Sequence, residues 1–488
     1  MDLSRQYGLF VHGGFRAATS GAAFSVSNPA TGEEVCTVAA AGVEDVSAAV
    51  AAGGDAWPEW WSRPAVERAG VLTAVAERIT AERERLAWTE TTDTGRVISE
   101  TRMDVDAVAD LFHYFAGVVR SDEDGLKRHD PQQMSMIVRE PFGVVGAIVP
   151  WNFPFLISGW KLAPALAAGN AVVIKPATLT PLSLLTLAEI TADLLPPGLL
   201  NVLPGSGREC GEAILDHPGI RKLSFTGSTE VGRHVAAKAA ARVIPATMEL
   251  GGKSANIVFP DADWDRAVEA AAMAIMMSQG QVCSAGSRLL LHDEIHDRFL
   301  SDLTDLVAGI RIGDPMDEQS RMGPLVSEEH CRSVEEYVSL GVSEGARVVT
   351  GGTRVSGFTA GAYLAPTILA DVTPAMRVAQ EEIFGPVLVT QRFSSDEEAV
   401  TIANASSYGL GGAVWTRDIS RALAVAQAVR TGTMWVNDYH PVPSGSPFGG
   451  FGASGYGREV HRTSLDAYSQ LKTIYVNLDR EPYGWYRS

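Results

Sequence analysis

The chain has 488 residues, of which 46% are hydrophobic and 20% charged, and its formal net charge at pH 7 is −18. This length is too great for one ordinary hydrophobic core and indicates two or three domains, while the composition excludes a largely disordered chain. The negative charge argues against nucleic acid and anionic membranes as partners, because both would repel the protein.

Two features of the chain indicate where the protein works. Residues 1–8 lack a basic segment followed by a long apolar core, so we expect no signal peptide, and no apolar run reaches membrane-spanning length. The four cysteines are scattered without metal-ligand spacing, as in proteins whose thiols stay reduced. We therefore expect a cytoplasmic protein.

The first part of the chain has the pattern of scaffold helices. Between residues 43 and 118, apolar positions such as Val71, Val75 and Ile79 recur at helical spacing with charged residues between them. Residues 119–141 interrupt this pattern with an acidic turn and then a strand-like stretch.

The middle of the chain alternates apolar strands with helical stretches, beginning with the strand at residues 144–149 and continuing to residue 250. Continuous apolar strands separated by helices imply a parallel sheet covered on both faces, which is the doubly wound nucleotide-binding architecture. A second alternating α/β region runs from about residue 252 to 451, and residues 468–476 have the pattern of a late strand.

Three stretches carry side chains suited to catalysis. Asn152 follows the strand at residues 144–149, and its amide N–H could stabilise an oxyanion, although an asparagine alone is more often a turn residue. Glu249 stands among small and apolar residues, and burial raises a carboxyl pKa towards neutrality, where the group can take a proton from water or a thiol. A turn carboxylate that caps nearby amides is the alternative interpretation.

Cys283 lies on a predicted loop between an apolar helical run and the strand-like residues 289–291. The small residues that follow it leave the sulfur uncrowded, which suits a nucleophile that must meet a substrate. The alternative is a cysteine that is only a buried small hydrophobe.

Three stretches of the sequence resemble phosphate or metal sites. Gly227, Ser228 and Gly232 are the better phosphate candidate, because they follow a strand and open a helix whose amide end attracts anions, with Ser228 as the expected N-cap. The glycines within residues 205–211 also follow a strand, but the last one is one residue late for the dinucleotide fingerprint. In residues 292–296 no glutamate immediately follows the first histidine, as the zinc-hydrolase motif requires, so we expect no metal.

Taken together, these stretches resemble the aldehyde dehydrogenase superfamily over nearly the whole chain. Further matching pieces follow in family order at residues 174–177, 225–233, 381–387 and 446–451. The resemblance implies an α/β fold with a doubly wound, Rossmann-like cofactor domain, a second α/β catalytic domain and a small β oligomerisation arm. The implied boundaries are residues 1–118 and 142–251 for the cofactor domain, 252–453 for the catalytic domain, and 119–141 with 468–488 for the arm.

The resemblance also implies a reaction, in which an aldehyde is oxidised to its carboxylic acid with NAD or NADP through a cysteine thiohemiacetal and thioester. Cys283 would attack the carbonyl, Asn152 and a backbone amide would hold the oxyanion, and Glu249 would activate the hydrolytic water. Lys161 and Glu459 would be candidates for the onward proton path.

The cofactor contacts that the resemblance implies are Trp151, Lys175, Thr178, Gly227, Ser228, Gly232, Leu250, Glu382 and Phe384. Lys175 would meet the adenosine ribose, and Glu382 and Phe384 the nicotinamide ribose and ring. The family often has a glutamate three residues after this lysine, which repels a 2′-phosphate. Thr178 removes that charge and leaves the choice between NAD and NADP open.

The implied substrate tunnel is lined by apolar side chains: Phe153, Ile157, Trp160, Met277, Val282, Val442 and Phe448. Such a tunnel favours an uncharged hydrophobic or aromatic aldehyde. Ser278 stands where the family usually has asparagine. The implied assembly is a homodimer or homotetramer formed through the arm.

Two other functions remain open at this point. A coenzyme-A-acylating semialdehyde dehydrogenase would share Cys283 and the cofactor fold, but it would normally lack a carboxylate at position 249. A non-catalytic structural protein on the same fold would have no reason to combine Cys283, Glu249 and Asn152.

Overall fold

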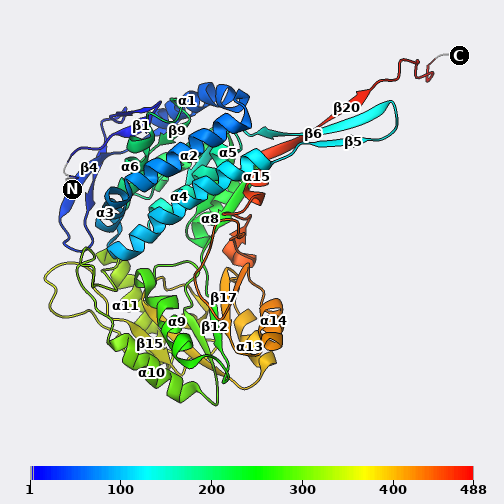
Figure 1. Ribbon diagram of the computed structural model, residues 1–488. Helices are drawn as coiled ribbons and strands as arrows, with labels where there is room; N and C mark the ends of the chain where they lie inside the picture. The colour runs from blue at the N-terminus through cyan, green and yellow to red at the C-terminus, as the bar shows by residue number, and fades with distance from the viewer. Residues whose placement is uncertain (1–2, 4, 487–488) are drawn as a thin grey trace.

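The computed structural model describes residue 3 and residues 5–486. Residues 1–2 and 4 of the N-terminal segment and residues 487–488 at the end of the predicted arm lie outside the described residues. In Figure 1, two α/β units lie one above the other, and a narrow β ribbon extends to one side.

The upper unit in Figure 1 is built on an eight-stranded sheet with the strand order β19-β11-β10-β7-β8-β9-β1-β2. Its strands are β1 (Leu9–Val11), β2 (Gly14–Arg16), β7 (Val144–Ile148), β8 (Ala171–Lys175), β9 (Leu200–Val202), β10 (Ile220–Thr226), β11 (Ala246–Glu249) and β19 (Gly455–Tyr456). From β11 to β9 every neighbouring pair is parallel. Every residue of β8 is buried, because helices cover both faces. The predicted doubly wound sheet is confirmed.

Helices cover the two faces of this sheet and form a separate core on each. They are α1 (Val43–Ser62), α2 (Ala65–Ala81), α3 (Arg83–Thr94), α4 (Ile98–Ser121), α5 (Pro154–Ala167), α6 (Leu182–Thr191), α7 (Glu212–Asp216) and α8 (Thr229–Ala241), with a π-helical turn at Gly207–Gly211. One core draws on α2 to α6, and the other on α1, α7 and α8. No helix in the described part of the chain is long and apolar enough to cross a membrane.

The lower unit is built on a seven-stranded sheet with the order β14-β15-β16-β13-β12-β17-β18, in which only β14 runs antiparallel to its neighbour. Its strands are β12 (Ala255–Val258), β13 (Arg288–His292), β14 (Arg347–Thr350), β15 (Thr367–Ala370), β16 (Val387–Phe393), β17 (Gly411–Trp415) and β18 (Thr433–Val436). Its helices are α9 (Trp264–Met276), α10 (His296–Ala308), α11 (Glu328–Ser343), α12 (Arg377–Gln380), α13 (Asp396–Asn404) and α14 (Ile419–Ala428). The second predicted α/β region is therefore present.

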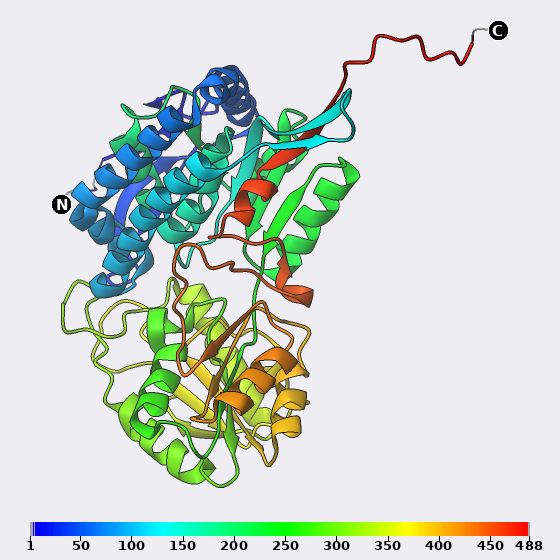
Figure 2. The same ribbon diagram turned by 45° about the vertical axis from the view of Figure 1, so that its right-hand side comes forward.

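A three-stranded ribbon leaves the body of the molecule and carries the C-terminal end of the chain (Figure 2). It consists of β5 (Gly125–Arg128), β6 (Gln133–Pro141) and β20 (Ser469–Asn477), and the short helix α15 (Thr463–Ala467) precedes it. Leu471 and Tyr475 on β20 are 67% and 77% exposed. The predicted late strand is present, and the described residues leave apolar side chains on it uncovered.

Some strands could not be predicted from local patterns. Residues 9–39 contain β1, β2 and a separate two-stranded sheet of β3 (Ala23–Ser27) and β4 (Glu34–Ala39), for which the sequence offered no prediction. These strands are short, so periodicity does not distinguish them from loops. Likewise β19 pairs with β11 across a long separation in sequence, a contact that no local pattern indicates.

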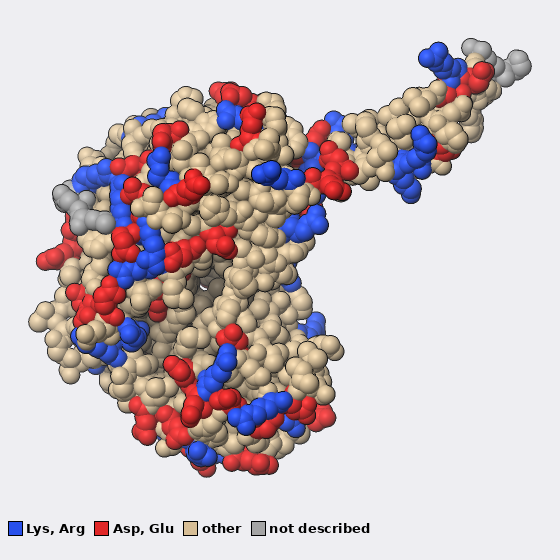
Figure 3. Space-filling view, in the orientation of Figure 1, with Lys and Arg blue, Asp and Glu red and all other residues tan. Residues whose placement is uncertain are grey.

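The two sheets are joined end to end by residues 250–254. Because β11 ends at Glu249 and β12 begins at Ala255, the chain leaves the carboxyl edge of the first sheet and enters the amino edge of the second. Figure 3 shows the hollow between the two units. In the first sheet β7 lies between β8 and β10, and this is the switch point where doubly wound sheets bind ligands.

Candidate active site

A cavity of about 230 Å³ lies where the two sheets meet. Its walls are Pro150, Trp151, Asn152, Phe153, Ile157, Thr226, Gly227, Ser228, Glu249, Leu250, Gly251, Cys283, Glu382 and Phe384. The cavity therefore brings together Cys283, Glu249 and Asn152, which are far apart in the sequence. Pro150, Thr226 and Gly251 were missed, although each adjoins a predicted site residue.

Strand register explains why one half of the site assembles. Thr226 at the end of β10 lies opposite Glu249 at the end of β11, and Asn152 follows the end of β7, which is the other neighbour of β10. The Gly227 amide donates to the Glu249 carbonyl at 3.1 Å. Carboxyl ends of parallel strands share one edge, so these side chains are placed by the sheet itself.

The second sheet contributes its amino edge. Cys283 precedes β13, and Glu382 and Phe384 precede β16. Cys283 lies on a loop, as predicted, and its thiol is half-buried. A Cβ at Gly252 would lie 2.4 Å from the Cys283 carbonyl oxygen, so only glycine lets the linker between the sheets pass so close to this loop.

The Cys283 thiol and the Glu249 carboxyl group both have raised pKa values. Burial raises the pKa of Cys283 to about 12, and the negative charges of Glu382 and Glu249 add to the effect. Burial also raises the pKa of Glu249 well above its usual value, with the charge of Glu459 adding to the shift and Lys161 opposing it. The thiol is therefore protonated at neutral pH and needs a base to become a nucleophile.

Neither carboxylate oxygen of Glu249 has a hydrogen-bond partner among the described residues, although the side chain is only 3% exposed. The interpretation of Glu249 as a turn carboxylate that caps amides is therefore wrong. A buried carboxylate without partners is costly, and such groups are kept at sites where they act on protons.

Lys161 and Glu459 form a buried ion pair with 2.8 Å between Nζ and Oε1. Lys161 also donates to the Ser224 hydroxyl at 3.1 Å, and the second oxygen of Glu459 has no partner within the described chain. Because both charges act on the Glu249 pKa, the pair lies close behind that carboxylate. Neither residue lines the cavity.

Asn152 is tied to the loop that carries the thiol. Its Nδ2 atom donates to the Gln281 carbonyl at 2.8 Å, and the side chain is buried. In this loop, Ser278 and Gln279 have left-handed backbone conformations, with φ of 51° and 55°. Each such non-glycine residue costs about 1–2 kcal/mol, so contacts elsewhere must hold this turn.

The predicted cofactor residues form a close-packed wall. Ser228 caps α8 by accepting from the Val231 amide at 3.4 Å. A Cβ at Gly232 would lie 2.3 Å from Leu250, which explains the glycine. On the opposite wall, the Glu382 carboxylate accepts from the Gly252 amide at 3.0 Å, and burial raises its pKa to about 7.

Two predicted cofactor residues lie outside the cavity. Lys175 is buried and donates to the Pro176 carbonyl at 2.9 Å, whereas Thr178 is exposed and donates to the Gly205 carbonyl at 3.0 Å. A Cβ at Gly211 would meet the Lys175 side chain at 4.0 Å. The glycine pattern at residues 205–211 therefore lies beside Lys175, although its spacing does not match the dinucleotide fingerprint.

The predicted substrate residues occupy one hydrophobic region. Phe153 and Ile157 line the cavity, and the rings of Trp160 and Phe448 pack 5.1 Å apart. Val282 belongs with these four to one core cluster, and Val442 and Cys283 pack against it. Met277 is half-buried at the start of the 3-10 turn Met277–Gly280 that follows α9.

The described residues contain no group of three or more His, Cys, Asp or Glu side chains placed to hold a metal ion. His292 packs edge-on against Phe393, and His296 contacts Asp297 at 2.9 Å.

A doubly wound sheet of the nucleotide-binding kind, with a thiol and an unpaired carboxylate at its carboxyl edge, fits an oxidoreductase that uses a nucleotide cofactor. The model of the aldehyde dehydrogenase family matches residues 15–474, and the chain belongs to this family. It is accordingly an enzyme that oxidises aldehydes with a nicotinamide cofactor, as the sequence predicted.

Relatives of known name are similar along their whole length. A betaine aldehyde dehydrogenase of Bacillus subtilis (strain 168) is 41% identical over 488 residues, which cover 98% of this chain and 99% of that protein. The solved structure of betaine aldehyde dehydrogenase from Staphylococcus aureus in complex with NAD+ has a TM-score of 0.97 at 37% identity, with 99% and 97% of the two chains covered. That of PnpE from Pseudomonas sp. WBC-3 has a TM-score of 0.97 at 41% identity, with 99% and 100% covered.

The raised pKa values of Cys283 and Glu249 predict how activity depends on pH. Both groups must lose a proton to act, so kcat should rise steadily from about pH 6 to about pH 9. Steady-state rates over this range, measured with saturating aldehyde and cofactor, check the prediction. A rate that falls as pH rises in this range would contradict it.

Proposed function

We propose that this enzyme releases its product by hydrolysis and that Cys283, Asn152 and Glu249 divide the reaction between them. The observation that carries the proposal is the buried Glu249 carboxylate, whose two oxygens are unpaired in the same cavity as the thiol. A coenzyme-A-acylating enzyme would need no such base, so the carboxylate favours the hydrolytic reaction. The structural-protein alternative is excluded by family membership and this cavity together.

The reaction begins when the Cys283 thiol loses its proton to solvent and the sulfur attacks the aldehyde carbon. The carbonyl oxygen becomes an oxyanion, which the remaining N–H of Asn152 and a backbone amide stabilise. A nicotinamide held in this cavity would supply the acceptor for the hydride that the adduct loses as it becomes a thioester on Cys283. Glu249 then removes a proton from the attacking water, the carbon–sulfur bond breaks, and the acid leaves.

A dinucleotide would lie with its nicotinamide end in this cavity and its adenosine end outside it, beside Lys175. The N-terminus of α8, capped by Ser228, offers free amides to phosphate, and Gly227 and Gly232 let the start of this helix pack closely against Phe225 and Leu250. Glu382 would bind the nicotinamide ribose beside Phe384, whose ring packs edge-on against Trp151 at 5.2 Å. Lys175, with the glycines of residues 205–211 beside it, would hold the adenosine ribose, and Thr178 lies nearby.

Protons from Glu249 would leave through the buried pair Glu459 and Lys161, because both charges act on its pKa and one Glu459 oxygen is unpaired. The aldehyde would lie against Phe153 and Ile157, with Trp160, Met277, Val282, Val442 and Phe448 behind them or at the mouth of the tunnel. This surface favours an uncharged hydrophobic or aromatic aldehyde. Two of the relatives above are named for betaine aldehyde, so that cation is the comparison substrate for a panel.

We propose that each sheet belongs to one domain. The cofactor domain comprises residues 1–118 and 142–251, and the catalytic domain comprises residues 252–453. Residues 119–141 and 468–488 form the arm. The arm would join two or four copies of the chain. The four cysteines are free, which supports a reducing, cytoplasmic location.

Separating the two half-reactions tests the roles of Cys283 and Glu249. Cys283→Ala should be inactive from the first turnover. Glu249→Gln should release about one equivalent of reduced cofactor per site and then stall, because a neutral amide cannot deprotonate water, with a steady-state loss of roughly a hundred- to ten-thousand-fold. Rapid mixing with absorbance detection measures both phases. Turnover of Glu249→Gln near the wild-type rate would exclude Glu249 as the base.

The exposed Thr178 predicts that NADP is used as well as NAD, because no carboxylate there repels a 2′-phosphate. Thr178→Glu should lower kcat/KM for NADP by about tenfold and leave that for NAD within about twofold, as a like charge beside the phosphate would do. Initial rates with each cofactor decide this. Absence of NADP activity in the wild type would show that the pocket is wrongly assigned.

The uncovered strand β20 predicts an assembly through the arm, since an exposed apolar edge invites pairing with another chain. Removal of residues from Gln470 onward should yield monomers, whereas replacing only the exposed Tyr475 by serine should weaken the assembly less. Light scattering coupled to size-exclusion chromatography gives the masses. An unchanged oligomer in the truncated, folded protein would refute the prediction.

A further inference from the structure

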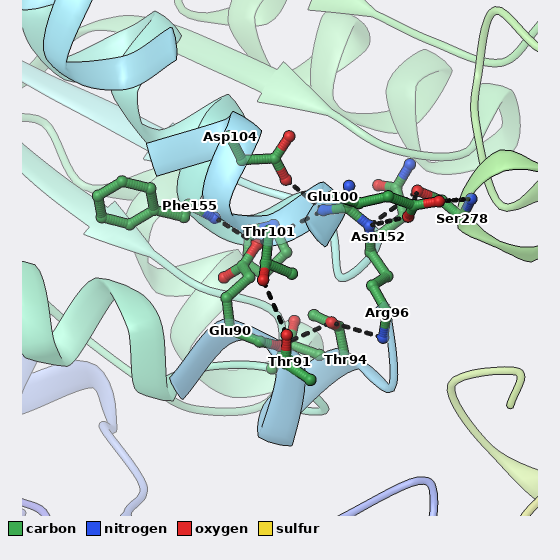
Figure 4. Close-up of polar contacts among 12 residues, drawn as sticks. Glu90, Thr91, Thr94, Arg96, Glu100, Thr101, Asp104, Asn152, Phe155 and Ser278 are labelled. Carbon is green, nitrogen blue, oxygen red and sulfur yellow. Dashed lines mark hydrogen bonds and ion pairs between the residues drawn. The ribbon is translucent and has the colours of Figure 1, made fainter. Parts of the chain in front are cut away.

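A group of buried charges lies beside the active site, and the mechanism above does not use it. Arg96, in the turn between α3 and α4, is fully buried and pairs with Asp104 on α4. Glu100 and Glu90 lie 3.6 Å and 3.9 Å from the same guanidinium. Figure 4 shows these side chains together with Asn152 and Ser278.

Arg96 and Glu100 contact the turn that leads to Cys283. Glu100 accepts from the Ser278 amide at 3.1 Å and from the Ser278 hydroxyl at 2.8 Å, one bond on each carboxylate oxygen. The same hydroxyl accepts from Arg96 Nε at 2.8 Å. Ser278 is therefore held at both its backbone and its side chain.

Ser278 has a backbone conformation that is unfavourable for a residue other than glycine. Ser278 and Gln279 are both left-handed, and Gly280 follows with φ of 70°. A Cβ at Gly280 would lie 2.1 Å from the Gly385 carbonyl oxygen, so this turn packs against the segment that leads to β16. A strained turn persists only where its surroundings determine it, and Glu100 supplies two of those contacts.

The guanidinium also reaches the other half of the oxyanion site. It stacks 3.8 Å from the ring centroid of Phe153, the neighbour of Asn152. Asn152 in turn donates to the carbonyl of Gln281, two residues before Cys283. Arg96 therefore contacts a residue near each group. Phe153 is next to Asn152 in the sequence, and Ser278 lies in the turn that leads to Cys283.

We propose that Arg96 and Glu100 are positioning residues that hold the left-handed turn at Ser278 and so set the Cys283 sulfur against the Asn152 amide. The inference rests on the proposed function, in which these two groups meet the carbonyl. It assigns a purpose to Ser278, whose hydroxyl links the two charges. A displacement of about 1 Å in such a site can lower a rate about a hundredfold.

Glu100→Gln tests this assignment, because the amide keeps the volume but has one acceptor oxygen in place of two, so it can accept only one of the two hydrogen bonds from Ser278. The burst of reduced cofactor should slow by about ten- to a hundredfold, while KM for the cofactor stays within about twofold. Arg102→Gln is the matched control, since Arg102 lies on the same helix and its partners Glu84 and Glu318 are exposed. It should leave the burst rate unchanged.

Rescue separates positioning from simple stabilisation. Glycine adopts the left-handed region freely, so Ser278→Gly added to Glu100→Gln should restore the burst rate about tenfold more than Ser278→Ala added to it. Loss of a merely stabilising charge network would affect both double variants equally. A burst rate of Glu100→Gln within about twofold of wild type, or equal double variants, would overturn the proposal. If Glu100→Gln does not fold, the single variants Ser278→Gly and Ser278→Ala decide by the same comparison.

Measurements on the wild type distinguish failure of the proposed function from failure of the positioning role of Arg96 and Glu100. If it oxidises no aldehyde, the proposed function fails. The positioning role is then read from the rate at which iodoacetamide alkylates Cys283, which needs no substrate. That rate should differ from wild type by at least about threefold in Glu100→Gln and return towards it in the glycine double variant. An alkylation rate indifferent to all of these variants would overturn the positioning role.

Discussion

The proposed chemistry depends on the cost of burying one carboxylate without a partner. Glu249 ends a parallel strand whose neighbours cover it, and it keeps two free oxygens in a cavity that excludes most solvent. The surrounding polar groups could have satisfied it, yet Lys161 is engaged by Glu459 and Ser224 instead. The fold therefore maintains a carboxylate whose pKa is raised by burial and whose oxygens are free to take a proton.

The site follows from how the two sheets are joined. Open α/β sheets bind ligands at their carboxyl edge, and the first sheet obeys this rule. The second sheet presents its amino edge, because the chain runs directly from β11 into β12. Loops that precede strands, carrying Cys283 and Glu382, thus face loops that follow strands. The reactants meet at a junction between units that neither sheet could form alone.

The sequence predicted most of the fold and the three central site residues. The elements and residues that it did not predict were missed for physical reasons. Continuous apolar strands indicated the doubly wound sheet, and the family motifs indicated Cys283, Glu249 and Asn152 together. The strands within residues 9–39 are too short to carry a period, and β19 is defined by its partner and not by its own residues. Arg96 and Glu100 gave no signal, because in a helical pattern they look like surface charges, and only tertiary packing buries them.

Two buried acids make the stability of the fold depend on pH in the opposite direction to the expected reactivity of the site. The pKa values of Glu90 and Glu382 are both raised by burial to about 7, from 4.5 in an unfolded chain. The folded state thus holds protons that the unfolded state releases, so stability is greatest below about pH 4.5 for these two groups and is lost as pH rises through about 7. The thiol and its base, by contrast, gain reactivity over the same rise. For these two acids, the pH range that favours the folded state is therefore the range in which the thiol and its base are least reactive.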